Sequence, residues 1–204
     1  MNKIINKLSS YSFNELVVEE FFDFHKLYKC GIEKVSKNIH YYPVENIDFI
    51  GVYLKINNGI LEGYNARLPR VTNLYSALIH IHETMHCLML ENRLNKEYED
   101  SDLDEVIPVL YEGLFINFLI ANKRYNLSEL YSEYQEYRKN KIGNITGNKK
   151  NAYTNAYLLQ DELLERFKEN PNKFLKNIRD IIKNKKNLEN YLNDDNEIKK
   201  MTIN

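Results

Sequence analysis

Cysteine is scarce in this chain of 204 residues, which contains only two. Two thiols, Cys30 and Cys87, are too few for a disulfide scaffold, so we expect reduced thiols in the cytosol. Charge of one sign is also lacking, because 28 basic and 29 acidic residues leave a formal net charge of -1. This balance gives no electrostatic reason to expect binding to nucleic acid or to a membrane surface.

Long hydrophobic runs are lacking as well. The longest apolar stretches are short and interrupted, so we expect no transmembrane span. The first residues, MNKIINKLSSYSFNEL, do not contain the continuous apolar core and small-residue cleavage site of a secretion signal. Hydrophobic residues make up 43% of the chain and charged residues 28%, as in ordinary globular proteins. We therefore expect a cytoplasmic protein, with residues 1–204 forming a single domain.

The first part of the chain, residues 1–45, is expected to be helical. Ser12 and Glu15 match the capping-box pattern S-x-x-E, and the apolar residues that follow repeat at helical spacing. These signals predict a helix over residues 13–37, in a region that Pro43 ends.

A β-hairpin is expected next, over residues 46–70. Two strand-like runs, DFIGVYLK and ILEGYNARL, flank a turn that contains Asn58 and Gly59. An Asn-Gly pair between such runs is a strong short-range signal for a tight hairpin turn.

Helices account for the rest, residues 72–204. Thr72 or Asn73 can cap a long helix through SALIHIHETMHCLMLENRL. Further helices are predicted over VIPVLYEGLFINFLIANKRY, YSEYQEYRK and NAYTNAYLLQDELLERFKEN, with two shorter pieces near the end and loops over EYEDSDLDE and IGNITGNKK. A helix, a small antiparallel sheet and then many helices predict a predominantly α-helical α+β fold.

Histidine is concentrated in the stretch HIHETMH, which holds three of the five in the chain. His82 and His86 are four residues apart on the predicted helix, so both rings project from one face and can share a metal ion. Glu83 stands beside them and can act as a general base. His80 projects from a different face, and we expect it to have a structural role.

A catalytic zinc site needs a third protein ligand and one open position for water. Two glutamates of the following helix, Glu105 and Glu112, are seven residues apart and therefore share a helix face. We expect Glu105 to be the third ligand. Pro108 agrees with this choice, since a proline belongs in the first helical turn and places Glu105 at the helix start. Glu112 is the alternative third ligand, or it accepts a hydrogen bond from a ligand histidine.

These motifs resemble those of the gluzincins, zinc peptidases whose His-Glu-x-x-His helix is followed by a glutamate on another helix. Within them, the chain is most similar to the thimet oligopeptidase and oligopeptidase F family, whose glutamate helix reads Asp-Phe-x-Glu-x-Pro-Ser-Gln-x-x-Glu. The segment DLDEVIPVLYE matches this pattern at Asp102, Glu105 and Glu112, while Pro108 is one position late and Ser-Gln is missing. The resemblance implies that Glu105 is the zinc ligand.

The resemblance extends on both sides of the zinc motif, from Leu61 to near the C-terminus. GYNARLPRVTN is similar to the strand that precedes the zinc helix in that family, although Met85 stands where the family prefers glycine. NAYTNAYLLQDELLERF is similar to its Tyr-Tyr-Ser-Tyr-Leu helix, whose last tyrosine stabilises the transition state. The resemblance places this role on Tyr157, with Tyr153 as the alternative.

The resemblance implies a zinc-dependent metallopeptidase with one Zn2+ per chain, which hydrolyses oligopeptides or unfolded segments. Glu83 would activate a zinc-bound water, and Tyr157 would stabilise the oxyanion. We expect the peptide substrate to pair with the hairpin edge at residues 60–67 by strand addition. Two other interpretations stay open: a catalytically silent gluzincin-like peptide-binding module, and a helical protein without metal. Glu83 favours the enzyme, since a binding module needs no base.

Overall fold

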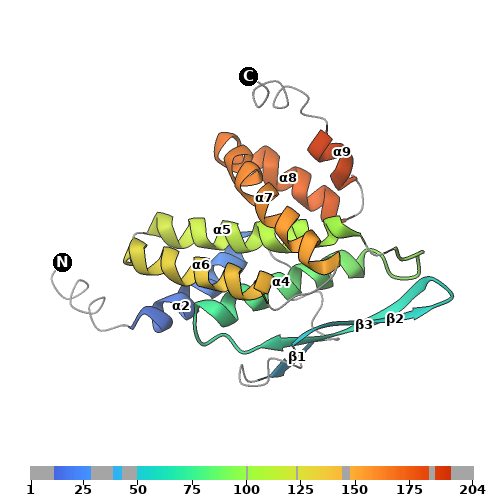
Figure 1. Ribbon diagram of the computed structural model, residues 1–204, viewed down its shortest axis with the longest axis horizontal. Coiled ribbons are helices and arrows are strands. Elements are labelled where there is room, and N and C mark those ends of the chain that lie inside the picture. The colour runs from blue at the N-terminus through green and yellow to red at the C-terminus, as the bar shows by residue number, and fades with distance from the viewer. Residues whose placement is uncertain are drawn as a thin grey trace.

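The computed structural model describes residues 12–28, 39–42, 50–99, 101–122, 124–143, 148–183 and 187–193. Most of these residues are helical, and three strands form one small sheet along the lower side of the helices in Figure 1, which confirms the predominantly helical α+β class. The elements are, in order, α2 (Phe13–Tyr28), β1 (Ile39–Tyr42), β2 (Gly51–Asn57), β3 (Ile60–Pro69), α4 (Leu74–Glu91), the 3-10 helix η3 (Asp102–Glu105), α5 (Val106–Asn122), α6 (Leu127–Gly143), α7 (Asn148–Glu169), α8 (Pro171–Ile182) and α9 (Leu188–Asn193).

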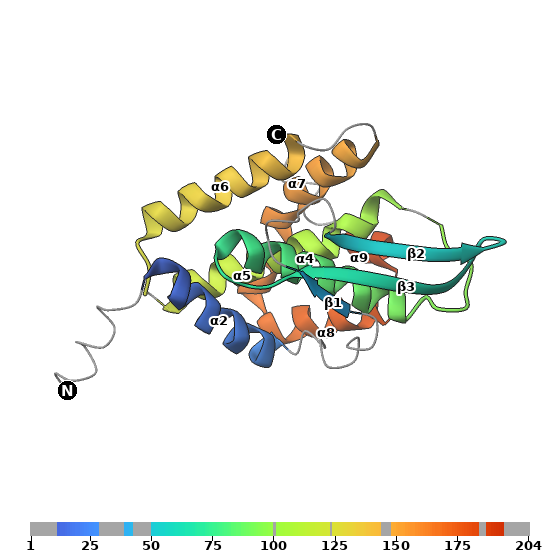
Figure 2. The same ribbon diagram turned by 90° about the horizontal axis from the view of Figure 1, so that it is seen from below.

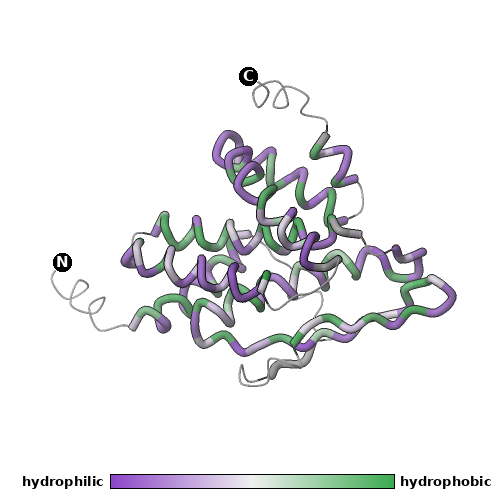
Figure 3. The backbone as a smooth tube through the Cα atoms, in the orientation of Figure 1, coloured by the Kyte–Doolittle hydropathy of each residue, from purple (hydrophilic) through white to green (hydrophobic). Residues whose placement is uncertain are grey.

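A hairpin supplies two of the three strands. Strands β2 and β3 pair in antiparallel fashion around Asn58 and Gly59, which have φ angles of 50° and 78°. Positive φ at both positions suits a type I′ turn, and this is the reason for the Asn-Gly pair. Figure 3 shows hydrophobic and hydrophilic residues mixed along the two strands. Leu61, Ala66 and Leu68 of β3 are buried, whereas most residues of β2 are exposed, so the covered part of the hairpin lies mainly on β3.

Strand β1 was not predicted from the sequence. It pairs in parallel with residues 66–69 of β3, so that β3 lies at the centre of the sheet. The prediction of a helical segment over residues 1–45 is therefore wrong for residues 39–42. A strand of only four residues shows no clear period of its own, and its backbone hydrogen bonds come from β3.

Helix α4 connects the sheet to the other helices. Asn73, rather than Thr72, is its N-cap: the side chain of Asn73 accepts hydrogen bonds from the N–H and the hydroxyl of Ser76. Strand β3 packs against one side of α4 and helix α5 against another, an arrangement that Figures 1 and 2 show from two directions. His80 and His82 are therefore buried, and His86 is partly buried.

Helix α5 lies at the centre of the helical part, and its sequence is hydrophobic on almost every side. It packs against α4 and α7, and Gly113 permits the close approach to α7. A Cβ atom at Gly113 would lie 2.8 Å from the side chain of Gln160. Pro108 is in the first turn, as predicted, where its missing N–H leaves no hydrogen bond unmade. No helix in the described ranges is both long enough and apolar enough to cross a membrane.

The start of the first helix agrees with its predicted capping box. The backbone N–H of Ser12 donates to a carboxylate oxygen of Glu15, and the N–H of Glu15 approaches the hydroxyl of Ser12. Helix α2 is described as far as Tyr28. The remainder of the predicted helix, residues 29–37, lies outside the described residues.

Two predicted loops contain more helix than expected. The acidic segment EYEDSDLDE ends in η3, and the segment IGNITGNKK begins inside α6 and ends inside α7. Only residues 144–147 of the second segment lie outside the described helices. Ser101 is the N-cap of η3 and accepts a hydrogen bond from the N–H of Leu103, so this short turn has its own capping signal.

Candidate metal centre

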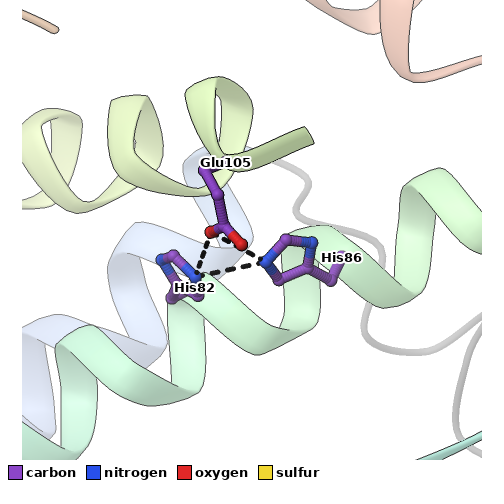
Figure 4. A group of neighbouring side chains, drawn as sticks. All are labelled: His82, His86 and Glu105. Atoms are coloured by element: carbon purple, nitrogen blue, oxygen red, sulfur yellow. Dashed lines mark hydrogen bonds and ion pairs between the residues drawn. The ribbon is translucent and has the colours of Figure 1, made fainter. Parts of the chain in front are cut away.

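Three side chains from two elements meet beside α4, as Figure 4 shows. His82 and His86 project from one face of α4, and Glu105 reaches them from the end of η3. The Nε2 atoms of His82 and His86 are 3.2 Å apart, and Oε2 of Glu105 lies 3.1 Å from the first and 3.2 Å from the second. Atoms that bind zinc tetrahedrally at about 2.0 to 2.1 Å are about 3.3 Å apart, so these three atoms fit three corners of such a site.

A salt bridge next to the ligands ties η3 to the end of α4. Arg93 lies two residues after the end of α4, and its guanidinium donates to Oδ1 of Asp104 at 2.7 Å. Asp104 is the neighbour of Glu105, so this contact limits the movement of the glutamate relative to the two histidines. The structure thus brings together the three residues predicted as ligands from the sequence.

Glu112 lies behind His82 instead of among the three ligand atoms. Its side chain is fully buried, and its Oε1 lies 2.7 Å from Nδ1 of His82. A carboxylate oxygen of Glu112 accepts a hydrogen bond from Nδ1, so Nε2 is the ring nitrogen that faces His86 and Glu105. Glu112 therefore fixes the ring orientation of His82, which is the second of the two roles predicted for it.

Two tyrosine hydroxyls hold Glu112 in place. Tyr137 of α6 donates to Oε1 and Tyr157 of α7 donates to Oε2, both at 2.8 Å. Together with His82, they give the buried carboxylate three hydrogen bonds, which offsets the cost of removing its charge from water. Burial, followed by the charge of Glu112, raises the pKa of both tyrosines far above the ordinary value, so both hydroxyls keep their protons.

Among the residues of α7, Tyr153 places its hydroxyl at the ligand atoms. The hydroxyl lies 3.0 Å from Nε2 of His82, and the ring stacks against the His82 ring with centroids 5.6 Å apart. The hydroxyl of Tyr157, one helical turn further on, is bonded to Glu112. Of the two predicted tyrosines, Tyr153 is therefore the one whose hydroxyl lies at the candidate ligand atoms. The rotation of α7 decides between them, and the sequence pattern of that helix does not report its rotation.

The charges of the cluster depend on one another. Burial and the charge of Lys141 act to lower the pKa of His82, but hydrogen bonds to Glu105 and Glu112 outweigh them and raise it to about 9. Burial acts to raise the pKa of Glu105, yet His86 and His82 hold it well below its ordinary value. Both directions favour an imidazole of His82 that keeps its proton beside Glu105. A metal ion bound here would have to replace that proton.

Glu83 follows His82 directly on α4, and its side chain is 13% exposed. The ammonium of Lys141, from the last turn of α6, lies 4.0 Å from Oε1 of Glu83. The same ammonium lies over the ring of Tyr153, 5.3 Å from its centroid. Lys141 thus lies beside both Glu83 and Tyr153. The expected base and the nearby hydroxyl donor are therefore on the same side of the three ligand atoms.

His80 has the structural position expected for it. Its side chain is buried, and its Nδ1 lies 3.0 Å from the carbonyl oxygen of Pro69, at the end of β3. Its ring packs edge to face against Phe21, with centroids 5.0 Å apart. His80 therefore joins α4 to the sheet and to α2, away from the three ligand atoms.

The edge of β3 that was expected to receive a peptide is partly occupied. Strand β2 pairs along one side of β3, and β1 pairs with residues 66–69 on the other. Residues 60–61 form backbone contacts with the segment 95–98. At most residues 62–65 can therefore pair with a further strand, so the expected edge of residues 60–67 is too long.

Two residues of the site, Lys141 and Tyr137, were not predicted from the sequence. They lie four residues apart on α6 and therefore share a helix face. This spacing was the available signal, but it does not show that the shared face is turned toward α4.

Comparisons of the chain with protein-family models, with curated proteins and with solved structures found no match. The similarity to the gluzincins therefore depends on the motifs themselves, and any function proposed for the site depends on its geometry.

Proposed function

We propose that this protein is a cytoplasmic zinc-dependent metallopeptidase of the gluzincin kind, which hydrolyses peptide bonds in oligopeptides or unfolded segments. One observation carries the proposal: the ligand atoms of His82, His86 and Glu105 are 3.1 to 3.2 Å from one another. Beside them, Glu83 supplies a carboxylate that a site for metal storage alone does not need.

The donor atoms favour zinc over the common oxygen-seeking cations. Two imidazole nitrogens and one carboxylate oxygen are typical of catalytic zinc sites, which leave a fourth position for water. Magnesium and calcium prefer sites built from oxygen atoms. When bound, zinc lowers the pKa of a coordinated water to about 7, so that hydroxide becomes accessible near neutral pH.

Glu83 is proposed as the general base. Its carboxylate accepts a proton from the water and passes it to the amine that leaves when the peptide bond breaks. Lys141 is the described cation beside this carboxylate, at 4.0 Å. Glu83 therefore has a charged neighbour on the side that faces Tyr153.

Tyr153 is proposed as the hydrogen-bond donor to the substrate carbonyl oxygen. Burial, followed by the charges of Glu105 and Glu83, raises the pKa of Tyr153 far above its ordinary value, so the hydroxyl keeps the proton that it donates. Tyr157 acts indirectly, because its hydroxyl holds Glu112 and Glu112 orients His82.

The substrate backbone is proposed to pair with residues 62–65 of β3. Strand addition needs backbone groups on an open edge, and β1 and the segment 95–98 cover the flanking residues. The available edge suits a short extended segment of peptide.

The test combines metal content with peptide cleavage. We expect about one equivalent of zinc per chain in protein purified without added metal, and a sharp fall in His82→Ala and His86→Ala. We expect Glu83→Gln to keep zinc and fold but to lose nearly all cleavage of a random peptide library, because glutamine cannot accept the proton. Glu136→Gln, at an exposed position of α6, is the matched control.

Each alternative has its own result in this test. Zinc in the wild type without cleavage of any library peptide would indicate the silent binding module. Protein that binds no zinc when zinc is supplied would indicate a helical protein without metal. Wild-type cleavage by Glu83→Gln would show that the chemistry lies elsewhere.

A further inference from the structure

Lys141 occupies an unusual place for a lysine at a helix end. It belongs to the last turn of α6, yet its side chain is only 15% exposed and lies beside Glu83, next to the candidate ligands. Its Nζ is 4.0 Å from Oε1 of Glu83, which is too long for a hydrogen bond. Glu83 is therefore a charge partner of the ammonium rather than its hydrogen-bond acceptor.

Two tyrosine rings hold the ammonium in this place. Nζ lies 6.0 Å from the ring centroid of Tyr137 and 5.3 Å from that of Tyr153, within the range of cation–π attraction. The hydroxyls of the same rings contact Glu112 and His82, at 2.8 Å and 3.0 Å. The tyrosines that build the metal cluster therefore also fix the position of Lys141.

The carboxylates around the candidate ligands explain why a cation lies at this position. Glu83, Glu105 and Glu112 each have a carboxylate that is buried or nearly buried. A divalent ion offsets two negative charges, and the ammonium of Lys141 offsets the third. Charges in a place with little water are costly unless they are balanced, so the lysine complements the metal.

We propose that Lys141 is a positioning residue of this site, whose ammonium, held on the rings of Tyr137 and Tyr153, keeps the Glu83 carboxylate beside the open metal position. The proposal rests on the proposed zinc site. It predicts effects of opposite sign, because the ammonium repels a bound cation while it improves the placement of the base. A lysine that only stabilised the fold would support metal binding and turnover alike.

The first measurement is a zinc titration of the metal-free protein, which needs no enzymatic activity. We expect Lys141→Met to bind zinc about 3- to 10-fold more tightly, because a unit charge near a divalent ion is removed. Lys141→Arg keeps the charge and should bind zinc as the wild type does. Lys139→Met removes an exposed charge of the same helix and is the matched control.

The second measurement is peptide turnover by the zinc-loaded protein. We expect kcat of Lys141→Met to fall by about 10- to 100-fold with little change in KM, because a displaced base loses part of its contribution. Lys141→Arg should recover a substantial part of this loss. Circular dichroism and thermal unfolding identify a variant that fails to fold, in which case Lys141→Gln replaces Lys141→Met.

The two measurements separate this inference from the proposed function. Unchanged or weaker zinc binding by a folded Lys141→Met would overturn the positioning role, even if the wild type is an active peptidase. Unchanged kcat in that variant would overturn it as well. Absence of zinc binding or of peptidase activity in the wild type would instead contradict the proposed function.

Discussion

Replacement of Glu105 by glutamine should separate the ligand role from the supporting role of Glu112. Oε2 of Glu105 lies 3.1 Å and 3.2 Å from the two ligand nitrogens, as expected for a third ligand atom. Glu105→Gln replaces this anionic ligand by a neutral amide. Structural zinc sites with four ligands bind with about 10 to 16 kcal/mol, so one ligand contributes about 2.5 to 4 kcal/mol. We therefore expect zinc affinity to fall roughly 60- to 800-fold.

Replacement of Glu112 by glutamine should cost less. Oε1 of Glu112 accepts hydrogen bonds from His82 and Tyr137, and Oε2 accepts one from Tyr157. Glutamine has nearly the same shape, and its amide oxygen can keep the bonds to His82 and Tyr137. Its amide NH2 can then donate to the Tyr157 hydroxyl, which becomes the acceptor. The remaining loss of charge should lower zinc affinity about 10- to 100-fold, as changes to the partner of a ligand histidine do.

The assay is a zinc titration of metal-free protein in competition with a coloured chelator, at one fixed and slightly alkaline pH. Circular dichroism before the titration shows whether each variant is folded. Glu136→Gln, on the exposed side of α6, controls for the loss of one carboxylate charge. An equal loss in the two variants, or a larger loss in Glu112→Gln, would refute the assignment of Glu105 as the ligand.

Three further predictions concern the two tyrosines of α7, the packing at Gly113 and the protons released when zinc binds. Tyr153→Phe should keep zinc but lower kcat by about 100-fold, whereas Tyr157→Phe should act mainly on zinc affinity; kinetics and titration of both variants would show the reverse if Tyr157 faced the substrate. Gly113→Ala should destabilise the fold by about 1 to 3 kcal/mol in urea unfolding, because its Cβ would lie 2.8 Å from a buried glutamine of α7. Gly63→Ala, where a Cβ meets nothing within 4 Å, should have a smaller effect, and equal losses would contradict the packing. Zinc binding near neutral pH should release about one proton, because hydrogen bonds raise the pKa of His82 to about 9, and affinity should rise with pH until that proton is lost. Titration calorimetry in two buffers with different heats of ionisation measures this release, and a value of zero would show that His82 is already neutral.

The sequence was informative wherever residues close together in the chain determine the structure. The turn at Asn58 and Gly59 depends on two φ angles, and the start of α4 depends on hydrogen bonds between Asn73 and a residue three positions later. The shared face of His82 and His86 follows from four-residue spacing on one helix. These features need only local geometry, and the structure agrees with each of them.

Helix packing decided the features that sequence spacing left open. Glu105 and Glu112 share a face of the same chain segment, but only the approach of η3 to α4 puts the first beside His86 and the second behind His82. The choice between Tyr153 and Tyr157 depends on the rotation of α7.

The position of Lys141 and the pairing of β1 depend even more on contacts between distant parts of the chain. Lys141 reaches Glu83 only because α6 packs against α4. Residues 39–42 form the strand β1 only because residues 66–69 of β3 pair with them. Local spacing determines which side chains share a face of a helix. Which of these faces meets a neighbouring helix depends on the position and rotation of each helix in the core. Position and rotation depend in turn on how all the buried side chains fit together, which local spacing does not report.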